Sequence, residues 1–181
     1  LAQYKLGTLY EFGVSVKPDV KEATAWYKKA AEKNYTPAIL RLTYLEIQKT
    51  GFDEAKHSAW FDRVLEEVQA SEHNALILFG QMNRHGIAVE KNLNKAVVSL
   101  QQASSLGYTE VDSEIDAIKR EIAIYKEKRE LAKKKRAELK QVEKKKQAEI
   151  AAKKKAEAEK KKQAEAAKKK QAELAARQKA E

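Results

Sequence analysis

The sequence predicts an all-α protein in which a short α-solenoid of helix-hairpin repeats is followed by one long, extended, charged α-helix. Three observations predict this fold: a motif recurs about every 36–37 residues in the front part, the motif reads as two helices, and the rear part lacks helix breakers. No glycine follows Gly107 and no proline follows Pro37. The predicted domains are the solenoid at 1–112 and the helix at 113–181.

The excess positive charge lies only in the rear part of the chain. Residues 1–112 hold 13 of the 37 Lys/Arg and 14 of the 27 Asp/Glu, which leaves 24 and 13 in residues 113–181. The front part is therefore close to neutral at −1 and the rear part carries +11. Such a split indicates two physically different segments.

Several classes of site and segment are excluded by composition. The chain has no cysteine, which excludes disulfides, thiolate catalysis and Cys-ligated metals. No apolar run is long enough to cross a membrane, and no signal segment opens the chain. Because Leu1 stands inside a predicted helix, we expect the N-terminus to be a cut end, and the sequence leaves open whether a signal peptide or further repeats precede Leu1.

The front part contains three predicted repeat units, at about 2–37, 38–74 and 75–110. The middle unit is a degraded copy that begins at Ala38. The outer two units match each other when the chain is shifted by two repeat lengths, which pairs Gly7 with Gly80, Gly13 with Gly86, Val16 with Val89, Asp19 with Asn92, Ala23 with Ala96 and Ala30 with Ala103. Each unit cannot bury its apolar face alone, so neighbouring units are expected to stack.

Each unit reads as a helix, a loop and a second helix. In the first unit Gly13 is expected to end the first helix, and Asp19 is a predicted N-cap for the second helix. Helical spacing predicts that the first helix buries a face made by Ala2, Leu6, Leu9 and Tyr10. The same spacing predicts a buried stripe on the second helix, made by Ala23, Trp26, Tyr27, Ala30 and Ala31.

The order A-x3-L-G-x2-Y-x2-G-x2-V-x2-D-x3-A-x2-W-Y-x-K-A-A-x2-N-x3-A, from Ala2 to Ala38, resembles the Sel1-like repeat, a variant of the tetratricopeptide repeat. The resemblance extends to about residue 111 and is weakest in the middle unit. It implies an α-solenoid whose first helices line a concave surface, and an adaptor that holds protein partners. From exposed positions of the first helices it implies a partner-binding set: Lys5, Thr8, Glu11, Arg41, Tyr44, Gln81 and Arg84.

The rear part is predicted to be a continuous helix of roughly 100 Å. From Glu143 onward it consists almost entirely of Ala, Lys, Glu and Gln, which are strong helix formers. Glu precedes a cation by one helical turn at Glu149–Lys153, Glu157–Lys161, Glu165–Lys169 and Glu173–Arg177, the favoured orientation for helix-stabilising pairs. The composition is similar to the helical spacer of the TolA proteins of Gram-negative bacteria. An engineered rigid spacer has the same composition, although the drift in repeat length favours a natural chain.

The start of the rear helix differs from its remainder. Ile115, Ile118, Ile122 and Tyr125 form a narrow seam that we expect to cap the last repeat. Beyond Tyr125 the apolar residues become sparse, so a single solvated helix is favoured over a coiled coil, and weak self-association is the alternative. The lysine triplets do not share one stripe, and no aromatic residue follows Tyr125, so nucleic-acid binding is expected to be nonspecific at most.

The sequence offers no catalytic, cofactor-binding or metal-binding motif. The three histidines, His57, His73 and His85, have no paired ligand spacing, and we expect surface or capping roles for them. Trp26, Tyr27 and Trp60 fall in the repeat register, which favours the core over a ligand box. We therefore expect no enzyme and no cofactor.

The function that the sequence favours is a non-catalytic adaptor or scaffold, in which the solenoid binds a protein partner and the long helix is a spacer. The alternative is a structural component of a multiprotein cell-envelope assembly that contacts its neighbours through the long helix. The spacer-like composition favours the bacterial periplasm over the cytoplasm.

Overall fold

The computed structural model describes the backbone of residues 1–178 and the side chains of residues 1–172. The described part contains no strand, and the predicted all-α fold is confirmed. The helices are α1 (Ala2–Phe12), α2 (Val20–Ala31), α3 (Thr36–Thr50), α4 (Glu54–Gln69), α5 (His73–His85), α6 (Leu93–Ser105) and α7 (Asp112–Gln178), with a 3-10 turn η1 (Thr109–Val111) before α7. Contacts divide the chain into one unit at Leu1–Tyr125 and another at Lys126–Glu181.

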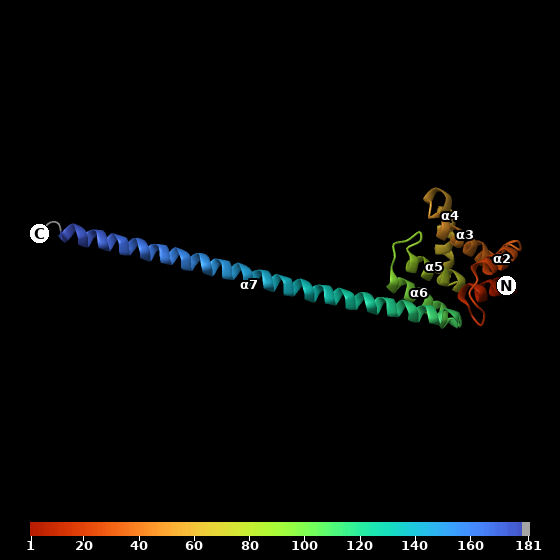
Figure 1. Ribbon diagram of the computed structural model, residues 1–181. Helices are drawn as coiled ribbons and strands as arrows, with labels where there is room; N and C mark the ends of the chain where they lie inside the picture. Colours follow the sequence, from red (N-terminus) through yellow and green to blue (C-terminus); the bar gives the residue numbers. More distant parts are fainter. Residues whose placement is uncertain (179–181) are drawn as a thin grey trace. The chain divides into compact units, whose positions relative to one another are not determined.

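In the first unit α1 packs against α2 and α5 against α6, whereas the two middle helices make their main contacts outside their own hairpin, α3 with α2 and α4 with α5 (Figure 1). The first helix of each outer pair ends at a glycine in the left-handed region, Gly13 at φ 69° and Gly86 at φ 70°. The second helices begin at side-chain caps. The Asp19 carboxylate accepts hydrogen bonds from the backbone N–H groups of Lys21 and Glu22, and Asp53 and Asn92 cap α4 and α6 in the same way.

The buried face of α1 differs from the predicted one: of Ala2, Leu6, Leu9 and Tyr10, only Tyr10 packs partly against the core. Tyr4 and Gly7 are buried, whereas Leu6 and Leu9 are each more than a third exposed. The reason is the close approach of α2, since a Cβ at Gly7 would overlap the ring of Tyr27. The face of α1 that is buried is therefore the one that carries Gly7, where α2 crosses, and the spacing of the leucines does not determine it.

The beginning of α7 occupies the place of the first helix of a further repeat unit. Val111, just before α7, stands one repeat length after Ala75, at the same repeat position. Val111, Ile115 and Ile118 are buried in one cluster with Leu76, Ile77 and Leu100 of the last hairpin, and Ile122 packs against that cluster. Tyr125 is exposed, with the Lys91 ammonium 6.0 Å from the centre of its ring.

No second helix folds back onto this part of α7. At the repeat position of Gly80, where α6 crosses α5, stands the exposed Asp116. At the position of Gly86, which ends α5, stands Ile122, so the helix has no left-handed residue at which to stop. A charged side chain at the crossing point and the missing glycine together leave the last hairpin covered by one continuing helix.

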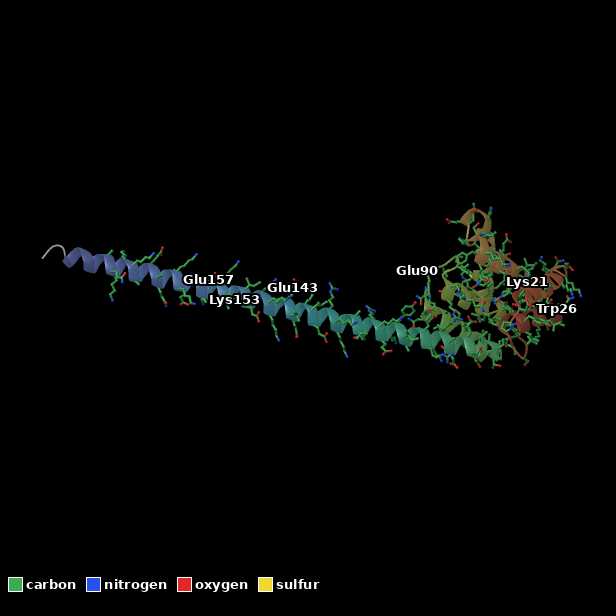
Figure 2. The ribbon with its side chains drawn as sticks, in the orientation of Figure 1. Lys21, Trp26, Glu90, Glu143, Lys153 and Glu157 are labelled. Carbon is green, nitrogen blue, oxygen red and sulfur yellow. The ribbon has the colours of Figure 1, made fainter. Side chains whose placement is uncertain are left out.

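From Lys126 onward, α7 exposes every side chain that the structure describes (Figure 2). The ion pair found there joins Lys133 Nζ to Glu130 Oε1 at 2.7 Å. Among the described side chains, the pairs predicted at Glu149–Lys153, Glu157–Lys161 and Glu165–Lys169 are not within ion-pairing distance, and Glu173–Arg177 lies outside the described side chains. Ion pairing on an exposed helix is too weak to fix one rotamer for each long side chain.

Candidate functional site

A groove of about 470 Å³ opens beside α1 in the first unit. One wall comes from α1, including Tyr4, Lys5 and Thr8. The opposite wall comes from the turns that begin the other first helices, with Tyr35 before α3, His73 at the start of α5 and Tyr108 before η1. Three repeats therefore contribute to one concave surface, because each hairpin places the start of its first helix at the same edge of the stack.

Aromatic rings make the floor of the groove rigid. The imidazole of His73 stacks on the ring of Tyr108, with centroids 3.5 Å apart and planes 7° from parallel. The rings of Tyr4 and Tyr35 meet edge to face at 5.3 Å. Burial lowers the pKa of His73, although the nearby Glu72 and Glu110 carboxylates oppose this shift. Paired rings hold one geometry at little entropic cost and present both apolar faces and polar edges.

Positively charged, negatively charged and neutral polar side chains line the groove beside these rings. Lys5 is exposed, and the Thr8 hydroxyl donates to the backbone carbonyl of Lys5 at 2.8 Å. Glu110 and Asn74 line the same groove. An ammonium, a carboxylate and a carboxamide around aromatic rings suit a peptide backbone and its side chains.

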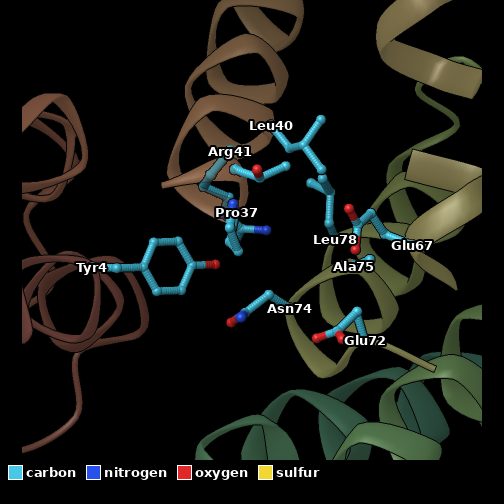
Figure 3. Close-up of a pocket in the computed structure, with 10 residues that line it drawn as sticks. Tyr4, Pro37, Leu40, Arg41, Glu67, Glu72, Asn74, Ala75 and Leu78 are labelled. Carbon is cyan, nitrogen blue, oxygen red and sulfur yellow. The ribbon is translucent and has the colours of Figure 1, made fainter. Parts of the chain in front are cut away.

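A narrow cavity of about 20 Å³ lies behind the groove, between the starts of α3 and α5 (Figure 3). Tyr4 points toward it from α1, and Asn74 faces it from α5. Its volume is enough for about one water molecule. The cavity is therefore too small for a substrate.

The structure separates the seven residues predicted to bind a partner. Lys5 and Thr8 line the groove. The predicted exposure is wrong for Arg41, Tyr44 and Gln81, which are only 2%, 1% and 7% exposed. Each of the three contacts a neighbouring helix, and burial between stacked units removes them from the concave surface.

Glu11 and Arg41 form a buried ion pair between α1 and α3. Arg41 donates two hydrogen bonds to the Glu11 carboxylate, at 2.8 and 2.6 Å, and the hydroxyl of Tyr27 donates a third at 2.6 Å. Burial alone would lower the pKa of Arg41, but the Glu11 carboxylate outweighs it and raises that pKa. The Arg41 guanidinium also lies 5.4 Å from the centre of the Tyr44 ring. This network joins the first two units.

Arg84 belongs to an equivalent network with the charges reversed. Arg84 stands at the end of α5 in the repeat position that Glu11 takes in α1, and Glu114 stands in α7 at the repeat position that Arg41 takes in α3. Arg84 donates to Glu114 at 2.7 Å, and Gln81 donates to the same carboxylate at 3.1 Å. Glu11, Arg41, Arg84 and Gln81 are therefore structural joints between successive first helices, the last of which is the start of α7.

The sequence prediction missed most of the groove lining, including four residues of its opposite wall: Tyr35, His73, Asn74 and Tyr108. They lie in or beside turns, outside the helical segments from which the prediction chose. A signal was present, since Tyr35 and Tyr108 occupy the same repeat position, one at the end of the first unit and the other at the end of the third.

The remaining candidates for chemistry take structural roles. Among the side chains of residues 1–172 no three His, Asp or Glu gather as metal ligands. His57 Nδ1 accepts a hydrogen bond from the backbone N–H of Asp53 at 2.9 Å, which is the predicted capping role. Tyr27 and Trp60 are buried as predicted, but Trp26 is not, and the Lys29 ammonium lies 4.1 Å from the centre of its ring.

Comparison with known proteins finds similarity in two of the repeat segments. The model of the Sel1 repeat family matches residues 1–35 and 73–108, and these ranges leave out the middle unit. A curated relative, an uncharacterized protein of Neisseria meningitidis serogroup B, is 32% identical over 103 residues. That match covers 57% of this chain but only 21% of the relative, so the chain spans about a fifth of the relative's length.

Two solved structures are also similar. A Sel1 repeat protein from Oxalobacter formigenes is 25% identical, with 63% of this chain and 46% of that one covered and a TM-score of 0.34. A protective antigen of uropathogenic Escherichia coli with an SLR fold is 26% identical, with 60% and 23% covered and a TM-score of 0.31. The family match rests on the repeat segments themselves: residues 1–35 and 73–108 of this chain are similar to the Sel1 repeat.

Proposed function

We propose that this chain is a non-catalytic adaptor whose solenoid binds a protein partner in the groove beside α1. Sel1-repeat proteins generally mediate protein–protein interactions and are typically non-catalytic. The observation that carries the proposal is the groove itself, which three units build from paired aromatic rings and exposed polar groups. Its volume of about 470 Å³ is in the range of ligand-binding sites.

An extended peptide segment is the occupant that fits this chemistry. The rings of Tyr35 and Tyr108 present apolar surface, while Lys5 and Asn74 offer donors to backbone carbonyls and the Thr8 hydroxyl oxygen offers an acceptor to a backbone N–H. A segment of a few residues would bury its side chains against the rings and satisfy its backbone at the rim.

The test compares how much partner protein is captured by the full chain and by two matched double variants. The double variant Lys5→Glu, Thr8→Arg reverses one charge at the groove and places a longer side chain in it. Lys21→Glu with Thr24→Arg makes the same changes on α2, where Thr24 donates to a carbonyl one turn earlier just as Thr8 does. Loss of capture in the groove variant alone supports the proposal, and equal capture by both variants would refute it.

The long helix is proposed as a spacer. The segment from Lys126 to Gln178 is helical throughout, and at about 1.5 Å per residue it measures about 80 Å. The spacer-like composition is also the ground for placing the protein in the bacterial cell envelope. In the described residues no helix is long and apolar enough to cross a membrane. Fractionation of cells that produce the natural protein tests this location.

A second candidate function is a structural part of an envelope assembly, in which α7 is the contact. The observation that favours it is the row of large apolar residues, including Leu131 and Leu139, that α7 exposes. Under this function the groove variant would keep its partners, and substitutions on α7 would lose them.

A further inference from the structure

Four of the apolar side chains that α7 exposes beyond Lys126 share one side of the helix with three lysines. The four are Leu131, Leu139, Val142 and Ile150, with exposures of 53, 69, 53 and 54%. At about 100° per residue these positions fall within an arc of about 100°. Near the middle of the same arc lie three exposed lysines, and Glu149 stands at its edge, at the same angle as Leu131. We call these seven residues the mixed face: Lys128, Leu131, Lys135, Leu139, Val142, Lys146 and Ile150.

The residues of the mixed face are also regularly spaced along the helix axis. It extends for about 33 Å, and lysines are interspersed with apolar residues along it. The step from Leu131 to Leu139 equals the step from Val142 to Ile150, so the apolar spacing reads the same in both directions. A solvated spacer needs no large apolar side chains, and Ala would serve better at each of these positions. The exposed leucines, valine and isoleucine are therefore positioned for contact.

A second copy of the chain is a poor occupant for this face. Residues 126–150 hold 11 Lys/Arg and 5 Asp/Glu, a net charge of +6 for each copy. A parallel pair would set Lys135 against Lys135, and an antiparallel pair centred between Leu139 and Val142 would set Lys135 against Lys146. Like charges at the seam of two helices are destabilising, so charge complementarity requires an acidic partner.

We infer that the mixed face binds an amphipathic, acidic helix of a partner protein. Such a helix would place apolar side chains against Leu131, Leu139, Val142 and Ile150, and carboxylates against the three lysines. This contact is a second interaction surface, separate from the groove and independent of its occupant. Burying the apolar side chains supplies affinity, while the lysines select for acidic partners and against a second copy.

The experiment uses the full chain and two synthetic helical peptides, each long enough to span the mixed face. In the patterned peptide, leucines repeat the spacing of the four apolar residues of the mixed face, and glutamates face the lysine positions. The second peptide has the same composition and charge, with its leucines distributed around the helix. We expect the patterned peptide to bind at least about tenfold more tightly, a difference of about 1.4 kcal/mol. Equal binding of both peptides would mean attraction between net charges alone and would overturn the inference.

Matched variants of the chain locate the contact. Leu139→Gln with Val142→Gln removes the centre of the mixed face and should weaken binding of the patterned peptide at least about tenfold. Ala137→Gln with Ala148→Gln makes the same number of changes on the opposite side of α7 and should leave affinity within about twofold. Circular dichroism checks that both variants keep their helix content.

Three other results would contradict the inference. Unchanged peptide affinity in the Leu139→Gln, Val142→Gln variant would show that the mixed face is not the site. Sedimentation of the unliganded chain as a dimer that this variant dissociates would make a second copy the occupant. Binding of a single-stranded oligonucleotide that displaces the patterned peptide and tolerates the same variant would make the lysines a phosphate site.

Discussion

The buried ion pair between Glu11 and Arg41 allows a sharp test of how the units are joined. Its two side chains are only 11% and 3% exposed, and Arg41 is fixed by two hydrogen bonds to one carboxylate. Replacing Arg41 by Ala leaves the Glu11 carboxylate buried with only the Tyr27 hydroxyl as a partner. Removing one member of such a pair costs about 3–5 kcal/mol of unfolding free energy.

The matched control is the exposed Arg63, which also bonds two carboxylate oxygens. Its side chain is 52% exposed, and it lies 3.2 Å from Glu66 and 2.6 Å from Glu67. Solvent screens these pairs, so Arg63→Ala should cost at most about 1 kcal/mol. Urea unfolding followed by circular dichroism measures both variants on the same scale.

The charge-reversed network at Arg84 and Glu114 adds a second arm to this test. The Arg84–Glu114 pair has the arginine on the earlier helix and the glutamate on the later one, the reverse of Glu11–Arg41. The double variant Glu11→Arg, Arg41→Glu should therefore be more stable than the single variant Arg41→Glu, in which two carboxylates meet. Full recovery is not expected, since the Tyr27 hydroxyl loses its acceptor. If Arg41→Ala costs no more than Arg63→Ala, the account of the joint is wrong.

Three further predictions concern the hairpins and the groove. A Cβ at Gly80 would lie 2.7 Å from Leu100 Cγ, so Gly80→Ala should lower the free energy of unfolding by about 1–3 kcal/mol in a urea titration; an unchanged midpoint would contradict the close crossing. Asp19→Ala removes the cap of α2 and should cost about 1 kcal/mol, measured in the same way. Because burial lowers the pKa of His73 in the folded state, the unfolded state binds more protons just below pH 6.5, and the free energy of unfolding should fall as pH drops through that window. His73→Asn should flatten this slope, and an equal slope in both proteins would show that His73 is not its source.

The features that the sequence predicts correctly depend on neighbours close in the chain. Gly13 ends α1 and Asp19 caps α2, and both effects depend on residues within one turn. The all-α class follows from the same local signals, together with the repeat. By contrast, Leu6 and Leu9 share a helical face that the structure leaves partly exposed, since the crossing of α2 at Gly7 decides which face is buried.

The candidate site was harder to predict because its burial depends on residues far apart in sequence. Arg41 looks like an exposed charge until α1 supplies Glu11, from the preceding repeat unit. The groove lies where turns from three repeats meet, so Tyr35 and Tyr108 become neighbours of one surface only after stacking. An alignment of the repeat units would have picked out these two tyrosines from the sequence alone, because they share one repeat position.

The central claim is that the groove beside α1 holds a protein partner, and site-specific crosslinking tests it most directly. A photoreactive amino acid is placed at Thr8 in the groove, and in a second protein at Thr24 on the outer helix α2. Irradiation in cells of the source organism should yield a discrete protein adduct from position 8 and none from position 24. An adduct from position 24 alone, or the same adducts from both positions, would contradict the claim.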